Sequence, residues 1–600
     1  MTRRELYRWA GWFGAVNAGL YLLVALRYLP AWSWPDAALA TVYVPLAMLG
    51  QMGLLAIALP FLVLGPLIAA WPARRLVMPV AVLLGAAGLV LLVLDTNLFV
   101  ERRFHLSLFT VVLFETSTWV FTGIVFLIAL AFESMLAGSL RRWLAGRPRP
   151  AGGRVLAAGI LACWVASQGL HVWADAVGYS PVTRFTAMLP LYYPLHGKRT
   201  LAKLGWLDEE RVRQARLLRQ GSADAAGDLR YPLKPLQCAA PGSAKSNVLW
   251  ILIDALRPDA IDPVSSPTVA AFRDAGQAFA NHWSGGNSSR MGLFSMFYGL
   301  PSTYWQTFYD VQRPPVLLEE FRHQGYELMT SSAVGYGSPT LIDRTVFAGV
   351  PGLKPEADAT GVEKNRAVTA DWLRWVDARR AGGTPAAPFF AFLYYDPPVT
   401  EGGATAGLVP DDRYLANGKA RERWLQYRNG VHMVDGEVAR VLAALESAGL
   451  RDDTLVMITS DHGYEFDDLG LGYYGHASNF GPYQLRATLL MRWPGKPARV
   501  YEHRTAHQDL PATLLAGLFA CTNDPADYSV GRNLFDGVSW DWIIAGSYHD
   551  HAIVEPGRVM VTEPGGFAEV LGPDYRPPAD ARPNARLIEE SMREMRRFYQ

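Results

Sequence analysis

Hydrophobic residues are concentrated at the start of the chain. Long apolar runs dominate residues 1–176, whereas later residues alternate short apolar runs with polar stretches. A helix needs roughly 20 mainly apolar residues to cross a bilayer. Five segments meet this requirement: Trp9–Leu29, Ala40–Leu64, Leu76–Leu98, Leu106–Phe132 and Val155–Asp175. The pattern therefore predicts an N-terminal all-α domain of five transmembrane helices over residues 1–176.

Basic residues between the spans predict their orientation. Arginines precede the first span and occur between spans two and three and between spans four and five: Arg3, Arg4, Arg8, Arg74, Arg75, Arg141, Arg142, Arg147, Arg149 and Arg154. With five spans these segments share one side, and basic loops face the cytoplasm. Arg102 and Arg103 are the exception on the other side. We expect a cytoplasmic N-terminus and export of everything after about Ala176.

Prolines and acids make some spans irregular. The second apolar run extends to Trp71 and contains three prolines, so we expect it to be tilted, kinked or partly interfacial. Asp95 and Glu115 lie inside or near the ends of spans. Such acids either mark a proton or lipid path, or sit at the interface or packed in protonated form. We favour the second interpretation.

Residues 177–246 form a connector between the spans and the rest of the chain. Its segment Leu189–Lys203 mixes aromatic residues with basic ones, among them Lys198 and Arg199. At the outer membrane face this basic pair would suit an anionic lipid headgroup. An ordinary amphipathic linker helix explains the same pattern equally well. Glu209–Gln220 is expected to be helical.

From Asn247 onward, strand patterns alternate with helical patterns. The predicted strands are Asn247–Asp254, Glu327–Ser331, Pro388–Tyr395, Thr454–Ser460 and Ala487–Arg492, and the predicted helices are Ser266–Ala275, Met291–Leu300, Val316–His323, Asn365–Arg380 and Trp424–Ala448. This order predicts an α/β domain over residues 247–600 with a mostly parallel central sheet. The charged tail Ala579–Gln600 is expected to form a surface helix.

Two buried strands end on hard metal ligands. Asp254 follows the run Val248–Ile253, and Asp461 and His462 follow the run Leu455–Ser460. Ligands of open α/β sheets bind at the carboxyl ends of strands. Two carboxylates with one imidazole suit one divalent ion such as Mg²⁺, Mn²⁺ or Zn²⁺. The alternative is that Asp254 only caps a turn.

A hydroxyl motif lies between these strands. Residues 285–290, GGNSSR, give a small-residue turn, two serines and an arginine before a predicted helix. A hydroxyl at a helix N-terminus, or in contact with a metal, is activated as a nucleophile. Ser288 is the first choice as nucleophile and metal contact, and Ser289 the second. The groups expected to bind substrate or stabilise its negative charge are Arg257, His282, Arg290 and His476.

Composition narrows the function. The net charge of +1 gives no case for a nucleic-acid partner. Three cysteines exclude a disulfide-dense scaffold. Cys163 lies in the fifth predicted span, whereas Cys238 and Cys521 follow the spans. If that part of the chain is exported, the latter two either form a disulfide or remain free thiols.

Several motifs resemble a known superfamily. ILIDALRPDAI resembles the opening motif of sulfatases and alkaline-phosphatase-superfamily enzymes, ITSDHGYEF their second metal motif, and LLMRWPGK their late core strand. The helix YRNGVHMVDGEV resembles the one that precedes the second motif. With five spans, the connector LPLYYPLHGKRTLAKLG and the segment NHWSGGNSSRMGLFSMFYGLP, the whole chain resembles inner-membrane proteins of the YejM/PbgA type.

This resemblance implies a periplasmic sulfatase-like domain, a role in lipopolysaccharide and outer-membrane lipid homeostasis, and lipid A contact at Lys198 and Arg199. It puts the metal on Asp254, Asp461 and His462, and gives His476 a role in steadying the substrate. Two departures argue against sulfate ester hydrolysis: the chain has no C/S-x-P/A-x-R motif, and Ala255 stands where sulfatases have a second aspartate. They fit phosphoethanolamine or phosphoglycerol transferases better, although Asp396 and Pro397 stand where that branch has a histidine.

Two classes of function follow. The chain is either a metal-dependent phosphoryl or phosphodiester hydrolase or transferase, or a binding and regulatory protein that senses a lipid and signals through its spans to an inner-membrane partner. We rank envelope regulation as the biological role. A transporter is disfavoured because the five predicted spans show no visible repeat.

Overall fold

The computed structural model divides the chain into two compact units, Met1–Ala215 and Arg216–Gln600. It describes residues 1–31, 38–102, 105–106, 116–145, 147, 153–177, 182, 185, 188–192, 195, 229–242, 246–357, 359–381, 387–397, 407–408, 410–548, 550–562, 568–579, 581 and 583–599. Each unit is considered by itself. The domain borders expected after residues 176 and 246 stay predictions.

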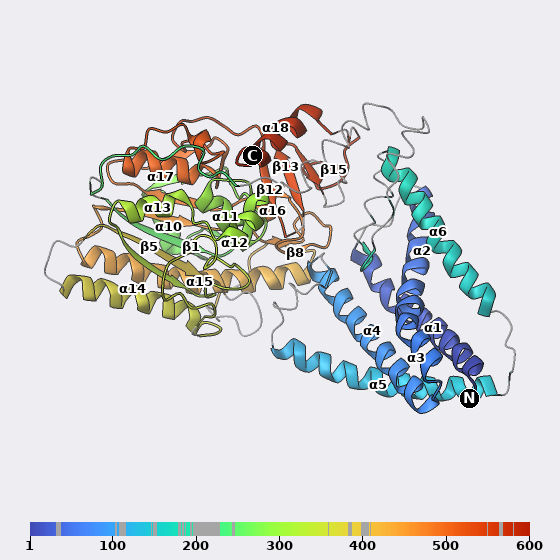
Figure 1. Cartoon of the computed structure of the whole chain (residues 1–600). Helices are drawn as coiled ribbons and strands as arrows, with labels where there is room; N and C mark the ends of the chain where they lie inside the picture. The colour runs from blue at the N-terminus through green and yellow to red at the C-terminus, as the bar shows by residue number, and fades with distance from the viewer. Residues whose placement is uncertain are drawn as a thin grey trace. The chain divides into compact units, whose positions relative to one another are not determined.

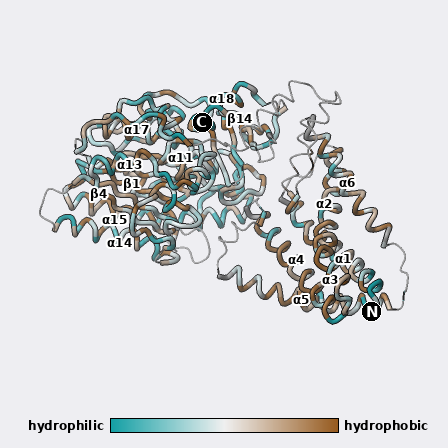
Figure 2. Tube along the Cα trace, in the orientation of Figure 1, coloured by the Kyte–Doolittle hydropathy of each residue, from teal (hydrophilic) through white to brown (hydrophobic). Residues whose placement is uncertain are grey.

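The first unit is built from apolar helices (Figure 1). They are α1 (Arg3–Ala25), α2 (Ala38–Gly53), α3 (Leu59–Ala70), α4 (Arg74–Arg102), α5 (Thr116–Ala145) and α6 (Gly153–Val177). Five stretches are long and apolar enough to cross a membrane: Arg3–Leu29, Ala38–Ala70, Arg74–Val100, Thr118–Ala145 and Val155–Ala174. Hydrophobic residues run along all of them (Figure 2). The five predicted spans are confirmed.

Two spans differ in detail from simple helices. In the second, a π-helical turn at Leu54–Ala58 joins α2 to α3, and such turns are common sites of helix irregularity. The fourth prediction was wrong at its end, because α5 continues past Phe132 to Ala145 and includes Arg141 and Arg142. A helix tolerates charged residues once it has left the hydrocarbon layer, so hydropathy alone does not mark where it stops.

Buried acids in this unit are held by hydrogen bonds. Asp95 is 4% exposed, and its carboxylate accepts hydrogen bonds from the Tyr28 hydroxyl and the Leu106 backbone N–H. Asp95 also lies 2.7 Å from His105 Nδ1, so it is a packed acid, and its protonation stays a prediction. Glu133, which the sequence analysis did not single out, is fully buried and accepts a hydrogen bond of 3.2 Å from Asn17 Nδ2. Glu115 lies outside the described residues.

The second unit contains the predicted α/β sheet. Its strands are β1 (Asn247–Ile253), β2 (Gln277–Phe279), β4 (Glu327–Ser332), β5 (Phe389–Tyr395), β6 (Thr454–Thr459), β9 (Leu489–Arg492) and β10 (Arg499–Tyr501). The order across the sheet is β10-β2-β9-β6-β1-β5-β4. β1 is parallel to both β5 and β6, and only β9 runs antiparallel to its neighbours. The expected mostly parallel sheet is confirmed.

Helices cover both faces of this sheet (Figure 1). Because side chains along a strand alternate between the two faces, alternate residues of β1 pack in different cores. Val248, Trp250 and Leu252 of β1 pack in one core with residues of α11 (Ser289–Tyr298), α13 (Val316–His323) and α17 (Asp509–Phe519). Leu249, Ile251 and Ile253 pack in the other with residues of α10 (Pro267–Asp274), α14 (Glu363–Ala381) and α15 (Gly418–Ser447). β1 therefore lies in the middle layer of a three-layer α/β/α domain, with a helical layer on each face.

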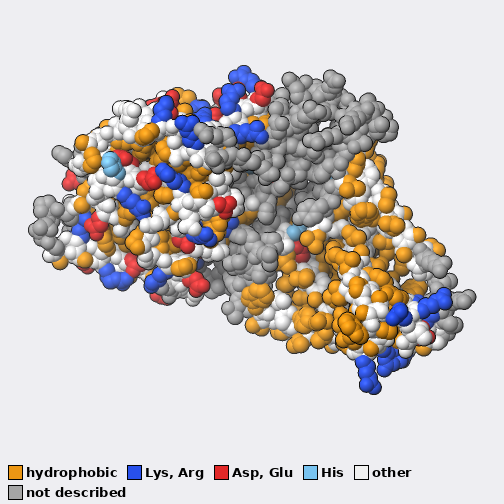
Figure 3. Space-filling model, viewed as in Figure 1, with side chains coloured by type: hydrophobic (Ala, Val, Ile, Leu, Met, Phe, Trp, Pro, Cys, Tyr) orange, Lys and Arg blue, Asp and Glu red, His pale blue; other side chains and the backbone are white. Residues whose placement is uncertain are grey.

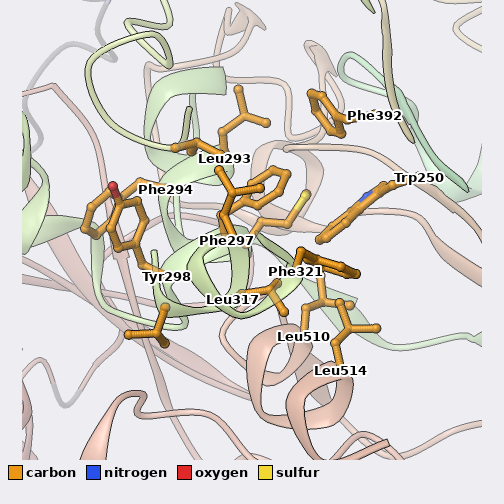
Figure 4. Close-up of a cluster of buried hydrophobic side chains, with 14 of the residues drawn as sticks. Trp250, Leu293, Phe294, Phe297, Tyr298, Leu317, Phe321, Phe392, Leu510 and Leu514 are labelled. Atoms are coloured by element: carbon orange, nitrogen blue, oxygen red, sulfur yellow. The ribbon is translucent and has the colours of Figure 1, made fainter. Parts of the chain in front are cut away.

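Aromatic packing anchors α11 on the sheet (Figure 4). The rings of Trp250 and Phe297 stack with centroids 4.7 Å apart. The Trp250 indole N–H also donates to Thr459 Oγ1 at 2.9 Å, which joins β1 to β6. The last turn of α11 is thereby packed on β1, and β1 is joined to β6, the strand that precedes Asp461.

A C-terminal antiparallel sheet was not anticipated. It consists of β12 (Ile543–Gly546), β13 (His551–Glu555), β14 (Arg558–Thr562) and β15 (Ala568–Leu571). Helix α18 (Ala585–Arg596) packs Ile588, Met592 and Met595 against this sheet. The helix expected in the tail is confirmed as α18, and its apolar face packs on this sheet. The smaller elements are β3 (His282–Trp283), β7 (Glu465–Phe466), β8 (Tyr474–Gly475), β11 (Thr505–Ala506), α12 (Trp305–Val311) and α16 (Pro482–Leu485).

Cys238 and Cys521 form a disulfide. Backbone hydrogen bonds flank it, from Ala239 N to Phe519 O and from Thr522 N to Gln237 O, each 2.9 Å long. The bond ties the segment before β1 to the end of α17. Of the two alternatives left open by the sequence, the pairing is the one confirmed, and Cys163 is a free cysteine.

Candidate metal centre

The strand ends bring Asp254, Asp461 and His462 together. Asp254 follows β1, and Asp461 and His462 follow the neighbouring parallel strand β6. One ligand atom from each residue lies within 4.8 Å of the others. Asp461 and His462 are fully buried, and the Asp254 side chain is 16% exposed. The sequence prediction that these three residues converge at one edge of the sheet is confirmed.

Asp461 offers a carboxylate oxygen that the protein itself does not use. Oδ1 accepts hydrogen bonds from the backbone N–H groups of Ala255 at 2.9 Å and His462 at 3.0 Å. Oδ2 lies 3.5 Å from His462 Nε2 and is buried without a hydrogen-bond partner among the described residues. A buried carboxylate oxygen is expensive to leave unpaired. Its position beside two further ligands fits a divalent cation.

His462 is held in the orientation that a metal ligand needs. Its Nδ1 lies 2.7 Å from the Gly463 carbonyl oxygen. Because a carbonyl only accepts, the proton is on Nδ1, and Nε2 keeps its lone pair toward the other two ligands. The ring of His476 stacks on that of His462 with centroids 4.4 Å apart. His476 therefore touches the centre through His462.

Asp254 is hydrogen-bonded by a tyrosine that the sequence analysis missed. The Tyr394 hydroxyl donates to Asp254 Oδ2 at 2.6 Å. Burial, reinforced by the negative charge of Asp461, raises the pKa of Asp254 to about 6. A bound divalent cation would favour the ionised form instead. Tyr394 pairs in register with Leu252 of β1, so knowledge of the strand order would have revealed it.

Of the two serines, Ser289 reaches the centre. It is the first residue of α11, and its Oγ lies 3.2 Å from His462 Nε2 and 3.3 Å from Asp254 Oδ2. Ser288 precedes the helix, is fully buried beside Tyr548, and forms no hydrogen bond to the described residues of the centre. The geometry thus favours Ser289 over the Ser288 that the sequence ranked first.

The predicted substrate groups Arg257 and Arg290 are both buried. Arg257 binds Asp259 and Asp468 and donates to Tyr464 O, so its guanidinium is engaged inside the protein. Arg290 follows Ser289, donates to Pro339 O at 2.6 Å and lies over the Trp305 ring. Burial lowers the pKa of Arg290 to about 10. Both guanidinium groups are thus engaged by protein groups, Arg257 by two carboxylates and Arg290 by a backbone carbonyl.

His282 belongs to a buried histidine pair. Its Nδ1 lies 2.9 Å from Thr505 Oγ1, and its ring centroid lies 5.0 Å from that of His507. Burial holds the pKa of His282 well below its usual range and lowers that of His507 to about 3. Both rings are therefore neutral near pH 7 and fill the interior. The structure gives His282 no contact with the three candidate ligands among the residues it describes.

A second carboxylate with a lysine lies beside Asp254. Asp396 directly follows β5, the strand next to β1, and accepts a hydrogen bond from Lys364 of α14. Burial and the charge of Asp254 raise the pKa of Asp396 to about 6, while Lys364 opposes that shift. The strand-end rule that found Asp254 would also have found Asp396. The predicted lipid-binding residues Lys198 and Arg199 lie outside the described residues.

Comparisons with known proteins match both units. The sulfatase family model matches residues 246–518, and a domain of unknown function, DUF3413, matches residues 1–238. The inner membrane protein YejM of Salmonella typhimurium is 28% identical over 623 residues, which cover 100% of this chain and 99% of YejM. The chain is thus similar to YejM along its whole length, and its second unit carries a sulfatase-like domain. An uncharacterized protein of Haemophilus influenzae is 27% identical, covering 99% of this chain and 96% of that protein.

Solved structures give more distant matches. A phosphonate monoester hydrolase from Silicibacter pomeroyi is 19% identical, with a TM-score of 0.44, and the match covers 59% of this chain and 96% of that one. An alkaline-phosphatase-superfamily protein from Vibrio parahaemolyticus is 14% identical, also with a TM-score of 0.44, covering 66% of this chain and 98% of that one.

Proposed function

We propose that this chain is an inner-membrane protein of the bacterial envelope that acts in lipopolysaccharide and outer-membrane lipid homeostasis, and that its sulfatase-like domain holds one divalent metal ion. The observation that carries the proposal is the convergence of Asp254, Asp461 and His462, with an unpartnered oxygen on Asp461. The envelope role rests on the full-length similarity to YejM.

A cytoplasmic N-terminus and a periplasmic α/β domain are part of this proposal. The five apolar stretches support it, because an odd number of crossings leaves the two ends of the spanning region on opposite sides. Lysine and arginine side chains gather near the N-terminal end of the first unit (Figure 3), as basic segments do on the cytoplasmic side. The Cys238–Cys521 disulfide supports an oxidising compartment for the second unit.

The three ligands would hold the metal, with Mg²⁺, Mn²⁺ and Zn²⁺ as the candidates. Two carboxylates and one imidazole accept any of these ions. A bound ion would supply positive charge that stabilises an oxyanion and favours loss of the serine proton. Tyr394 fixes Asp254, and Gly463 with His476 fixes His462, so the ligand atoms are held in place before the ion arrives.

Catalysis is the second candidate function, and the position of Ser289 supports it. Ser289 Oγ would bond to the phosphorus or sulfur of an ester while the bond to the leaving alkoxide breaks. The serine proton would pass to solvent, and the alkoxide would take a proton from solvent. Water or an acceptor hydroxyl would then release the group. The N-terminus of α11 favours the negative charge of such a group.

Binding without turnover is the alternative within the same fold, because fold does not settle function. In that case the centre would recognise a phosphate or sulfate group. Lys198 and Arg199 would contact an anionic membrane lipid such as lipid A, and the spans would engage an inner-membrane partner.

Metal content and turnover of the full chain in detergent test these candidates. We would compare wild type with Ser289→Ala, Ser288→Ala and Asp254→Asn on phosphomonoesters, phosphodiesters and sulfate esters. If the chain is an enzyme, the Ser289→Ala variant should keep its metal and lose turnover. The Asp254→Asn variant should lose the metal. Metal without turnover on any ester supports the binding role. No metal in the wild type contradicts the site. Loss of envelope function in the double variant Lys198→Ala, Arg199→Ala would place the regulatory role at the connector.

A further inference from the structure

A cavity of about 230 Å³ lies in the second unit, and neither the candidate ligands nor the two serines line it. Its walls come from the segment 530–542, from β12 and α18, and from Gln508, which precedes α17. Ligand pockets for drug-sized molecules usually measure about 300–1,000 Å³. This cavity therefore has room for one small ring or headgroup, and a folded peptide or a nucleic acid is too large.

Two tryptophans give the cavity aromatic walls. Trp540 and Trp542 both line it. The Trp540 indole N–H donates to both carboxylate oxygens of Asp509 at 3.0 Å, and the Arg532 guanidinium lies 4.0 Å from the centroid of its ring. These contacts hold the Trp540 indole in one orientation. Indole rings offer flat apolar faces against which the C–H groups of a ring-shaped ligand can pack.

Charged side chains complete the walls, and their formal charges cancel. Arg532 and Arg597 are balanced by Asp541 and Glu594. Arg532 Nη1 donates to Ser539 O and Arg597 Nη1 to Ser529 O, each at 3.1 Å, which fixes both guanidinium groups. Gln508 is 2% exposed, and its Oε1 has no hydrogen-bond partner in the part of the chain that the structure describes. The cavity thus offers donors and acceptors together with unused hydrogen-bonding capacity.

This combination selects a class of ligand. An acyl chain would take water away from Arg532, Asp541 and the Arg597–Glu594 ion pair without offering them hydrogen bonds, which is unfavourable. A compact anion would meet two carboxylates as well as two arginines, so it gains little from charge. Hydroxyl groups donate to carboxylates and accept from guanidinium groups, and a pyranose ring also presents C–H faces to indoles. We propose that this cavity binds a single sugar ring, either free or as the headgroup of a glycolipid.

The cavity is close to the loop that carries the serines. Gln508 Nε2 donates to Ile544 O at 3.2 Å, and a Cβ added to Gly285 would lie only 2.5 Å from that same nitrogen. The Gly285 carbonyl in turn accepts hydrogen bonds from Ser302 Oγ and Gly546 N. One buried side chain, Gln508, therefore separates the sugar cavity from the segment that leads to Ser289. This second site goes beyond the proposed function and does not depend on a metal.

Ligand-observed NMR and calorimetry on the full chain test the proposal. The chain is kept in a dimethylamine oxide detergent, because detergents with sugar headgroups would compete. The probes are methyl β-glucoside, methyl N-acetyl-β-glucosaminide and, as the anion control, inorganic phosphate. We expect saturable binding of at least one glycoside. Asp541→Asn should weaken it about tenfold, the effect of one charge-assisted hydrogen bond.

Asp536→Asn is the matched control, since Asp536 is an exposed aspartate near Asp541 that does not line the cavity. It should bind like the wild type. Trp542→Ala is a second test that leaves the charges unchanged, and each variant is compared with the wild type in melting temperature. In phosphatidylcholine bilayers with a glucosyl diacylglycerol, displacement of the free glycoside identifies a lipid headgroup as the occupant, whereas undisturbed binding identifies a free sugar. Absence of saturable glycoside binding, binding of phosphate alone, or unchanged binding in both Asp541→Asn and Trp542→Ala would overturn the proposal.

Discussion

The hydroxyl oxygen of Ser289 lies 3.2 Å from Nε2 of His462. The imidazole Nδ1 donates to the Gly463 carbonyl, so Nε2 is the acceptor and the serine hydroxyl is the donor. The first residue of α11 is thereby joined to the end of β6. The serine oxygen also lies 3.3 Å from Asp254 Oδ2. A bound metal would take up the Nε2 lone pair in place of this hydrogen bond, and the serine oxygen would then lie beside the ion.

Tyr394→Phe should weaken metal binding without unfolding the domain. The variant removes only the hydroxyl that donates to Asp254 Oδ2. Loss of such an outer contact typically lowers metal affinity by about 10–100-fold. Competition with a fluorescent chelator measures the change. Tyr395→Phe is the control, because its hydroxyl bonds to Thr369 instead. Equal metal affinity in both variants would contradict the assigned role of Tyr394.

Gly292→Ala should disturb the centre through the backbone. A Cβ at this position of α11 would lie 2.2 Å from the Asp461 carbonyl oxygen, so the helix must move away from β6. We expect a loss of about 1–3 kcal/mol in unfolding free energy, with weaker metal binding. Gly436→Ala in α15 is the control, because nothing lies within 4 Å of its added Cβ. That variant should gain about 0.5–1 kcal/mol. Thermal melting and metal titration of both variants measure these effects. If Gly292→Ala changes neither stability nor metal affinity, the close approach of α11 to Asp461 is contradicted.

Removal of the disulfide should destabilise the second unit. Cys238 and Cys521 are 283 residues apart in sequence, so their bond closes a long loop. Loss of a native disulfide typically costs about 2–5 kcal/mol. The double variant Cys238→Ser, Cys521→Ser should therefore melt well below the wild type, as should the wild type in reductant. Cys163→Ser, which alters the free cysteine, should melt like the wild type. Insensitivity of the wild type to reductant would argue against a structural disulfide.

Glu465 should make stability depend on pH. Burial raises its pKa from 4.5 to about 7, despite hydrogen bonds from Asn479 and Gln484. The folded chain thus keeps the proton to higher pH than the unfolded chain, so stability falls as the pH rises from about 4.5 to about 7. Glu465→Gln should remove this fall and gain about 2–3 kcal/mol relative to wild type between those limits. Melting curves across that range test it, with the exposed Glu589→Gln as control. If the stability of the wild type and of Glu465→Gln changes with pH in the same way, the raised pKa of Glu465 is refuted.

The strand ends were readable from the sequence because their signals are local. Buried apolar runs ending on Asp254 and Asp461 fixed both the parallel strands and the edge at which the ligands meet. The choice between Ser288 and Ser289 was not local. Successive helical residues point about 100° apart, so it depends on the residue at which α11 starts. In the fold α11 begins at Ser289, and Ser288 before it is extended, which the sequence motif alone did not distinguish.

Other misses have the same origin. Tyr394 reaches Asp254 because β5 is the neighbour of β1, and strand order was unknown from the sequence. The antiparallel strands β12–β15 are short, and the sequence analysis assigned none of them. Arg257 was expected to bind substrate, but it is paired with Asp259 two residues later and with Asp468, which only the fold brings to it.

Metal content is the most direct test of the central claim. The full chain would be purified in detergent, incubated with Mg²⁺, Mn²⁺ or Zn²⁺, freed of excess ion and analysed by mass spectrometry. Wild type is compared with Asp461→Asn, which alters the buried ligand, and with Asp452→Asn, an exposed aspartate before β6. The account predicts about one ion per chain in wild type and Asp452→Asn, and a loss of that ion in Asp461→Asn. Absence of any ion from the wild type, or equal content in all three, would contradict it.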